Sequence, residues 1–97
     1  MMNTTKTSER WERASLSLTT HCRQMMAARN ISDLDLERTV HDPSLRWPAA
    51  PRYGPGRFVH QGAGLVVVTG TPSPGGVVDV ITAYWLHADG RTGGVAA

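Results

Sequence analysis

Apolar and polar residues alternate strictly at the start of the first patterned segment, residues 14–19. Ala14, Leu16 and Leu18 are apolar, and a serine or threonine follows each of them. A period of two is typical of a strand with one buried face. The pattern therefore predicts a short strand.

The period then changes to that of a helix. Cys22, Met25 and Met26 are spaced three and four positions apart, so they share one helix face. Thr19 or Thr20 is suited to be the N-cap, because a threonine hydroxyl can accept a bond from an unpaired backbone N–H. We expect the first helix to begin at one of these threonines.

A second helix is predicted directly afterwards. Asn30 tolerates the left-handed conformation that commonly ends a helix, and Ser32 can cap the next one. Pro43 ends the second helix, because the residue before a proline is disfavoured in the α region. The apolar positions expected to pack are Ile31, Leu34, Leu36 and Val40.

The rest of the chain has the pattern of strands. Residues 44–56 hold three prolines and two glycines and are predicted to be a loop, whereas 57–61, 65–71 and 77–86 are predicted strands. Simple alternation in the last strand puts Val78, Val80, Thr82 and Tyr84 on one face and Asp79, Ile81, Ala83 and Trp85 on the other.

The element order is thus β-α-α-β-β-β. It predicts an α+β fold in which two helices pack on one face of an antiparallel sheet of about four strands. We expect a single domain over residues 14–86, with flexible segments at 1–13 and 87–97.

Composition narrows the class of protein. A chain of 97 residues forms one domain with a modest core. The single cysteine, Cys22, excludes an internal disulfide, and no apolar run or leader pattern indicates a membrane span or a secretion signal. We therefore expect a cytoplasmic protein without membrane contact.

The charges are unevenly distributed, although the net charge is only +2. Nine of the ten basic residues are arginine, and they concentrate before residue 30 and between residues 46 and 57. Such a chain could offer a basic face to a polyanion. An ordinary solvated surface of mixed charge is the alternative interpretation. The second helix is acidic, with Asp33, Asp35, Glu37 and Asp42 against Arg38.

Two residues of the first helix are candidates for chemistry. His21 lies at its start, where an exposed imidazole with a pKa near neutrality could be a general acid or base, or could simply cap or pack. Arg29 projects between Met25 and Met26 towards the sheet. It could bind a phosphate in a cleft, or it could form a structural ion pair with an aspartate.

The strands supply the remaining candidates. His60 and Arg57 alternate on one predicted strand, and the hydroxyls of Thr82 and Tyr84 share a face of another. Because His60 and Arg57 lie on opposite faces, only one of them can join a given cleft. The hydroxyl pair could bind a phosphate, although an ordinary wet strand face is commoner. The histidines and the cysteine lack the spacing of a metal site, so no metal and no cofactor are expected.

The chain resembles a small uncharacterised family of bacterial and phage proteins in four runs, THCRQMMAARNIS, LERTVHDP, RFVHQGAGLVVVTG and VVDVITAYW. That family is similar to the ribonuclease group of barnase, EndoU, colicins and RelE, which includes toxins of toxin–antitoxin systems. Two positions depart from its pattern: Asn30 replaces a glycine, and Met25 replaces a polar or basic residue. The matching positions are His21, Arg29, Ile31-Ser32, Pro43 and Ile81-Thr82.

The resemblance implies a RelE/barnase-like fold and a metal-independent ribonuclease toxin that acts on RNA. His21, Arg29 and His60 would be its catalytic residues, and Arg57, Thr82 and Tyr84 would bind the substrate. A cognate antitoxin or another protein would be a partner, and oligomers could form. The alternative is a non-catalytic binding or regulatory module that contacts a protein or nucleic acid.

Overall fold

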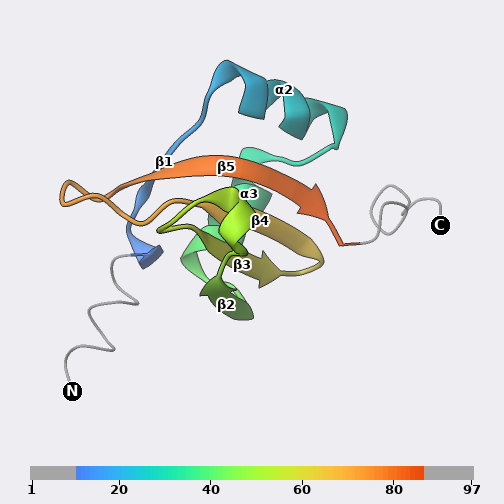
Figure 1. Ribbon diagram of the computed structural model, residues 1–97. Helices are drawn as coiled ribbons and strands as arrows, with labels where there is room; N and C mark the ends of the chain where they lie inside the picture. Colours follow the sequence, from blue (N-terminus) through green and yellow to red (C-terminus); the bar gives the residue numbers. More distant parts are fainter. Residues whose placement is uncertain (1–10, 87–97) are drawn as a thin grey trace.

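The structure is a computed structural model that describes residues 11–86 (Figure 1). The flexible segments predicted for residues 1–13 and 87–97 lie almost entirely outside this range. Of residues 11–13, Trp11 is buried in the core. The packed part of the chain therefore extends at least three residues before Ala14.

The described chain is an α+β unit with two α-helices and one five-stranded sheet. Its strands lie in the order β1-β5-β4-β3-β2, with β1 parallel to β5 and every other pair antiparallel. The predicted α+β class is confirmed, but the expected antiparallel sheet of about four strands was wrong in strand number and in the direction of β1. The elements are β1 (Ser15–Ser17), α2 (Thr20–Ala28), α3 (Asp33–His41), β2 (Leu45–Pro48), the 3₁₀ helix η1 (Pro51–Tyr53), β3 (Phe58–Gly62), β4 (Leu65–Thr69) and β5 (Val77–Trp85).

Both helices begin and end where the capping residues predict. The Thr19 hydroxyl accepts a bond from the Cys22 N–H, and the Ser32 hydroxyl accepts one from the Asp35 N–H, each at 3.0 Å. Asn30 takes the left-handed conformation at φ 59°. Within residues 11–86, no helix has the length and apolar character needed to cross a membrane.

Strand β2 lies in the segment that was predicted to be a loop. Ala49 donates its N–H to the Arg57 carbonyl (2.9 Å), and backbone groups alternate in direction along an antiparallel ladder. Trp47 therefore directs its backbone groups to β3, whereas Pro48 directs its own to the open edge. A proline has no N–H to leave unpaired there, so the residue that argued against a strand is compatible with an edge strand.

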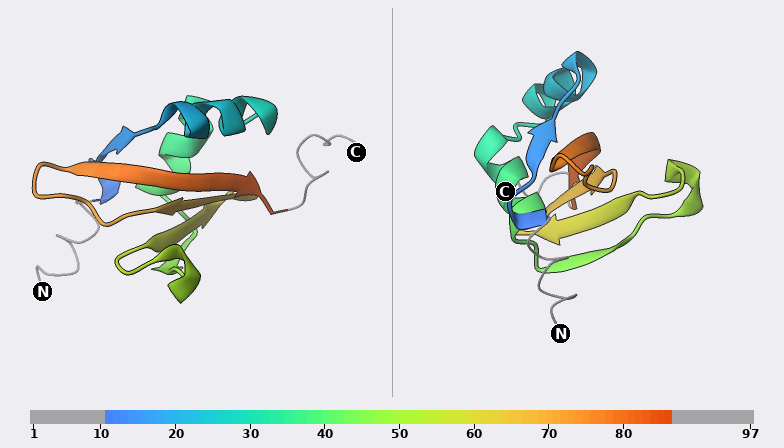
Figure 2. Two further views of the ribbon diagram at one scale, coloured as in Figure 1. Left: turned by 45° about the horizontal axis from the view of Figure 1, so that its top comes forward. Right: turned by 90° about the vertical axis from the view of Figure 1, so that its left-hand side faces the viewer.

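The two faces of the sheet are covered differently (Figure 2). Helix α2 packs against β5, and α3 packs against β3 and β4, all on one side. The other side, called here the helix-free face, carries a smaller cluster of Val59, Val66 and Val68, against which Tyr53 packs. The helix side holds the main core of Trp11, Ala14, Cys22, Met26, Ile31, Leu36, Val40, Leu65, Val67, Val78, Val80 and Ala83.

A β-bulge divides β5 into two halves. Val68 pairs with Thr82, but Thr69 pairs with Val80, so Ile81 is an extra residue on β5. The extra residue reverses the alternation beyond it. Val78 and Val80 therefore share the helix side with Ala83 and Trp85, and the face assignment from simple alternation was wrong for the second half of the strand. Tyr84 follows Val66 onto the helix-free side. Thr82, which pairs with Val68, instead directs its hydroxyl to Met25 of α2.

A chain of buried hydrogen bonds crosses the helix side of the sheet. Arg46 donates its Nε–H to His60 Nδ1 at 2.9 Å. His60 Nε2 lies 2.8 Å from the Thr69 hydroxyl, which itself donates to the Gly70 carbonyl at 2.9 Å. Because that hydroxyl proton is already used, His60 must donate from Nε2. Burial, and secondarily the positive charge of Arg46, lowers the pKa of His60 from 6.5 to about 3.

Arg46 connects this chain to two other parts of the molecule. One of its Nη groups donates to the Val40 carbonyl at the end of α3 (2.7 Å). Its guanidinium also lies 5.0 Å from the centre of the Trp11 ring, a cation–π distance. Burial lowers the pKa of Arg46 from its ordinary value, and the carboxylates of Glu12 and Asp42 oppose that shift. One side chain of β2 thus holds a helix end and the N-terminal tryptophan.

The neutral state of His60 predicts a loss of stability in mild acid. Between pH 6.5 and about 3, only the unfolded chain binds the proton, so the free energy of unfolding falls as the pH falls. We expect a loss of about 2 kcal/mol between pH 7 and pH 5, measured by urea unfolding. His60→Gln, whose amide does not titrate, should lack this part of the pH dependence. Parallel pH profiles of the two proteins would contradict the assignment.

Candidate functional site

The six predicted site residues do not lie together. Arg29 and Thr82 lie at the border between α2 and β5. On α2, His21 precedes Met25, the contact of Thr82, by about one turn and Arg29 by about two. Tyr84 points from the helix-free face, and the loop before β3 positions Arg57. His60 is inside the core. The structure therefore places these residues at separate locations instead of in one catalytic cluster.

At the α2–β5 border, Arg29 covers the open edge of β5. Strand β1 pairs only with the first three residues of β5, so the second half has no strand on that side. Arg29 Nη1 donates to the Ala83 carbonyl at 2.6 Å, and Trp85 Nε1 donates to the Arg29 carbonyl at 2.7 Å. The two bonds fasten the end of α2 to β5. Arg29 makes no ion pair with Asp33 or Asp79 in the described part of the chain.

His21 and Thr82 lie along the same border. The Thr82 hydroxyl donates to the Met25 sulfur (3.4 Å), and His21 precedes Met25 by four residues on the same side of α2. His21 is exposed, as its position at the helix start predicts. This border brings three of the six predicted residues to one flank of the molecule, with the imidazole open to solvent.

The other described histidines are engaged in structure. His60 is fully buried, and both of its ring nitrogens are hydrogen bonded. His41 Nε2 lies 2.9 Å from the Ala14 carbonyl. A general acid or base must come within hydrogen-bond reach of the substrate, and His60 cannot do so in this fold. We therefore do not include it in the proposed site.

Aromatic side chains gather with arginines around the helix-free face. Trp47 is 40% exposed and Tyr84 is 38% exposed, although both stand on strands. Tyr53 packs onto the valines of this face, the Arg52 guanidinium lies 5.1 Å from the centre of its ring, and Arg57 Nε donates to its carbonyl at 3.2 Å. The sequence indicates the concentration of arginines between residues 46 and 57 but does not join it to Tyr84, because β2 was not predicted.

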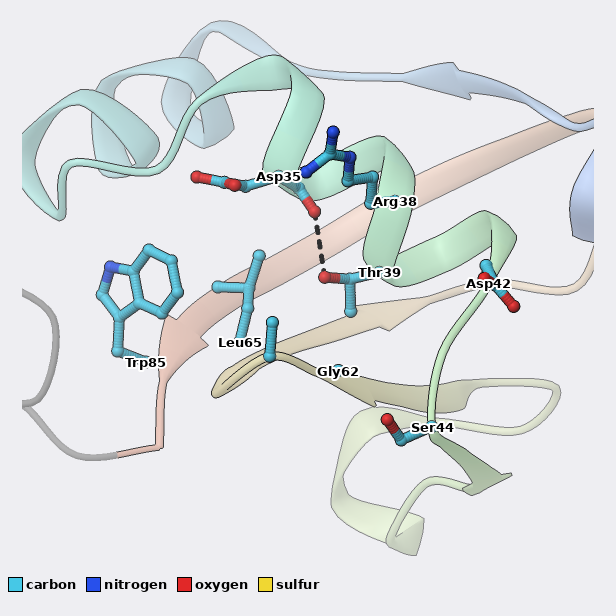
Figure 3. A pocket seen from close by; sticks show the side chains of 9 residues that line it. Asp35, Arg38, Thr39, Asp42, Ser44, Gly62, Leu65 and Trp85 are labelled. Atoms are coloured by element: carbon cyan, nitrogen blue, oxygen red, sulfur yellow. Dashed lines mark hydrogen bonds between the residues drawn. The ribbon is translucent and has the colours of Figure 1, made fainter.

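A groove on the helix side was missed entirely (Figure 3). It has a volume of about 460 Å³ and lies between α3 and the turn that joins β3 to β4. The charged residues that line it were recognised in the sequence only as an acidic helix. The residues that face them across the groove are brought there by the sheet topology, and no local sequence pattern indicates that topology. The lining residues are Asp35, Arg38, Thr39, Asp42, Ser44, Gly62, Ala63, Leu65 and Trp85.

Metal-ligating side chains are scattered over the described chain. Within residues 11–86, no three histidine, cysteine, aspartate or glutamate side chains are close enough to hold an ion. Cys22 is buried in the core, and burial raises the pKa of its thiol. A buried thiol of raised pKa is a poor nucleophile, so Cys22 is a packing residue.

Comparisons of the chain with models of known protein families, with curated proteins and with solved structures find no match. The resemblance to the ribonuclease group consequently stays a prediction from the sequence.

The edge contact of Arg29 predicts a modest role in stability. Arg29→Ala removes the bond to the Ala83 carbonyl, and we expect a loss of about 1 kcal/mol in urea unfolding. Arg29→Lys keeps a charged donor and should lose less. Arg38→Ala, which removes an exposed arginine of α3, is the control and should change little. A loss of about 3–5 kcal/mol would instead indicate a buried ion pair.

Proposed function

We propose that this protein is an RNA-binding module whose contact surface is the helix-free face of the sheet. The observation that carries the proposal is the exposure of Trp47 and Tyr84 on a face bordered by Arg52 and Arg57. Aromatic rings stack on bases of any sequence, and arginines pair with phosphates. Exposed aromatic rings and arginines on an uncovered sheet therefore favour single-stranded RNA, whose bases are accessible for stacking.

The strand register supports two separate stacking positions. Leu45, Gln61, Val66 and Tyr84 form one row across β2, β3, β4 and β5, and Trp47 begins the next row. Three strand spacings of about 4.8 Å separate the first and last strands, or roughly 14 Å. Two different bases fit at this separation.

The charge distribution supports the same face. Arg52 and Arg57 lie at its loop end, whereas the acidic side chains of α3 belong to the helix side. Asp79 is the exposed acidic residue of β5, at the opposite end of the strand from Tyr84. Phe58 pairs with Thr69 and Thr69 with Val80, so η1 and Arg57 lie at the Asp79 end of the sheet and Tyr84 lies at the other end. A polyanion would therefore meet the arginines and Tyr84 at opposite ends of this face.

Binding of a labelled single-stranded RNA dodecamer at fixed salt tests the proposal. Tyr84→Ala should weaken binding roughly tenfold, because stacking contributes about 1–3 kcal/mol per base, and Tyr84→Phe should retain most of the affinity. Arg52→Gln should also weaken RNA binding. Arg38→Gln, which removes the same charge on the helix side, should leave RNA binding unchanged. Equal losses for both arginine variants would indicate non-specific attraction, and no binding by the native protein would end the proposal.

Metal-independent ribonuclease activity is a second candidate function. The observation that favours it is the exposed His21 on the same flank as Arg29 and Thr82. In such a reaction His21 would take the proton of the ribose 2′-OH as this oxygen attacks the adjacent phosphorus, and the 5′-oxygen would leave with a proton. Arg29 could bind the phosphate only by giving up its hydrogen bond to the Ala83 carbonyl or through its remaining N–H groups.

Cleavage of the same RNA by the purified protein separates the two functions. Ribonuclease activity should persist in EDTA, leave a 2′,3′-cyclic phosphate end and disappear in His21→Ala, while RNA affinity is retained. Induced expression should slow bacterial growth only if the protein cleaves RNA, and His21→Ala should relieve that effect. If RNA binds without cleavage, the second candidate is removed and the binding module stands.

A further inference from the structure

The groove beside α3 lies on the helix side, opposite the proposed RNA surface. Its volume of about 460 Å³ lies within the range of ligand sites. Leu65 at its base is almost fully buried, and Thr39 is held in place by a bond to the Asp35 carbonyl (2.9 Å). The groove is therefore a preformed feature of the packing between α3 and the β3–β4 turn.

One wall of the groove carries alternating charges. Asp35 and Arg38 are three positions apart on one face of α3, and Asp42, the C-cap residue of this helix, follows Arg38 by four positions. The two carboxylates are seven residues apart, which corresponds to about 10 Å of helical rise. In Figure 3 they lie towards the two ends of the groove, Asp35 towards Trp85 and Asp42 towards Ser44.

The charges of this wall are largely unused within the protein. In the described residues, the Asp35 carboxylate and the Arg38 guanidinium have neither a hydrogen bond nor an ion pair. Side chains at this spacing often pair with each other on a helix surface. The Asp42 carboxylate acts electrostatically on Arg46, but it accepts no hydrogen bond from any residue between 11 and 86. Two carboxylates thus remain available to a cation that enters the groove.

The facing wall is built from small residues. Gly62 ends β3, Ala63 begins the turn to β4, and Ser44 lies beside Gly62 directly before β2. Ala63 is held in the left-handed conformation at φ 52°, so its methyl group is fixed by the turn. Small side chains here leave room for a main chain to lie along α3.

We propose that this groove binds an extended segment of a partner protein that carries two basic side chains about 10 Å apart. The net charge of its lining is negative, with two carboxylates against one guanidinium, which matches a cationic peptide. In an extended polyproline-type segment, residues three apart lie on the same side at about 9 Å. One lysine or arginine would meet Asp35 and the other Asp42. The proposal is independent of RNA binding, because the two surfaces lie on opposite sides of the sheet.

The probe is a capped Gly-Arg-Gly-Gly-Arg-Gly peptide, titrated into the isotopically labelled protein and followed by NMR shifts of the groove amides. Saturable shifts should centre on Asp35, Ala63 and Ser44, and a peptide with glutamine in place of both arginines should not produce them. The double variant Asp35→Asn, Asp42→Asn should bind about tenfold more weakly, since each exposed ion pair contributes up to about 1 kcal/mol.

The matched control is the double variant Asp33→Asn, Glu37→Gln. It removes the same charge from the same helix, but neither residue lines the groove. We expect its affinity for the peptide to match that of the native protein, with thermal melting verifying that both variants fold. Equal weakening in the two variants would show non-specific attraction and overturn the proposal. Absence of saturable shifts, or equally tight binding of spermidine, would overturn it as well.

Discussion

The hydrogen-bond chain from Arg46 through His60 to Thr69 is the interaction on which the rest of the structure depends. It joins β2, β3 and β4 across the sheet, and Arg46 extends it to the end of α3 and to the Trp11 ring. Each polar member has a partner, so the core tolerates a guanidinium and an imidazole without a stranded buried group. The same chain fixes β2 as the sheet edge, and the position of β2 places Trp47 on the helix-free face.

The sheet has two open margins, and different devices protect them. At β2, Pro48 occupies a position whose backbone points outward, where an N–H would otherwise be unpaired. At the second half of β5, α2 runs along the edge, and the Arg29 guanidinium donates a hydrogen bond to the Ala83 carbonyl. Of the two sequence-based alternatives for Arg29, the ion pair with an aspartate is absent from the described residues, and phosphate binding stays a prediction. The guanidinium is already committed in part to the backbone.

Local patterns predicted what local forces determine. The helix limits followed from the caps Thr19 and Ser32 and from Pro43, because capping bonds span only three or four residues. The parts that could not be predicted depend on contacts between distant segments. Strand β2 forms only because β3 pairs with it, and the bulge at Ile81 reverses two faces without any glycine to mark it. The exposure of His21 was predictable, but the burial of His60 was not.

The distribution of the histidines decides how the surfaces are best interpreted. Acid–base cleavage of RNA ordinarily requires one group to take a proton and another to give one. Among the described histidines, His60 is neutral and enclosed and His41 lies against a backbone carbonyl, so His21 has no second imidazole beside it. Stacking and ion pairing have no such requirement, because each ring or arginine acts on its own base or phosphate. The proposed RNA-binding face therefore requires only separated aromatic rings and arginines, whereas the proposed catalytic flank requires a second acid–base group beside His21, from Arg29 or from the bound RNA.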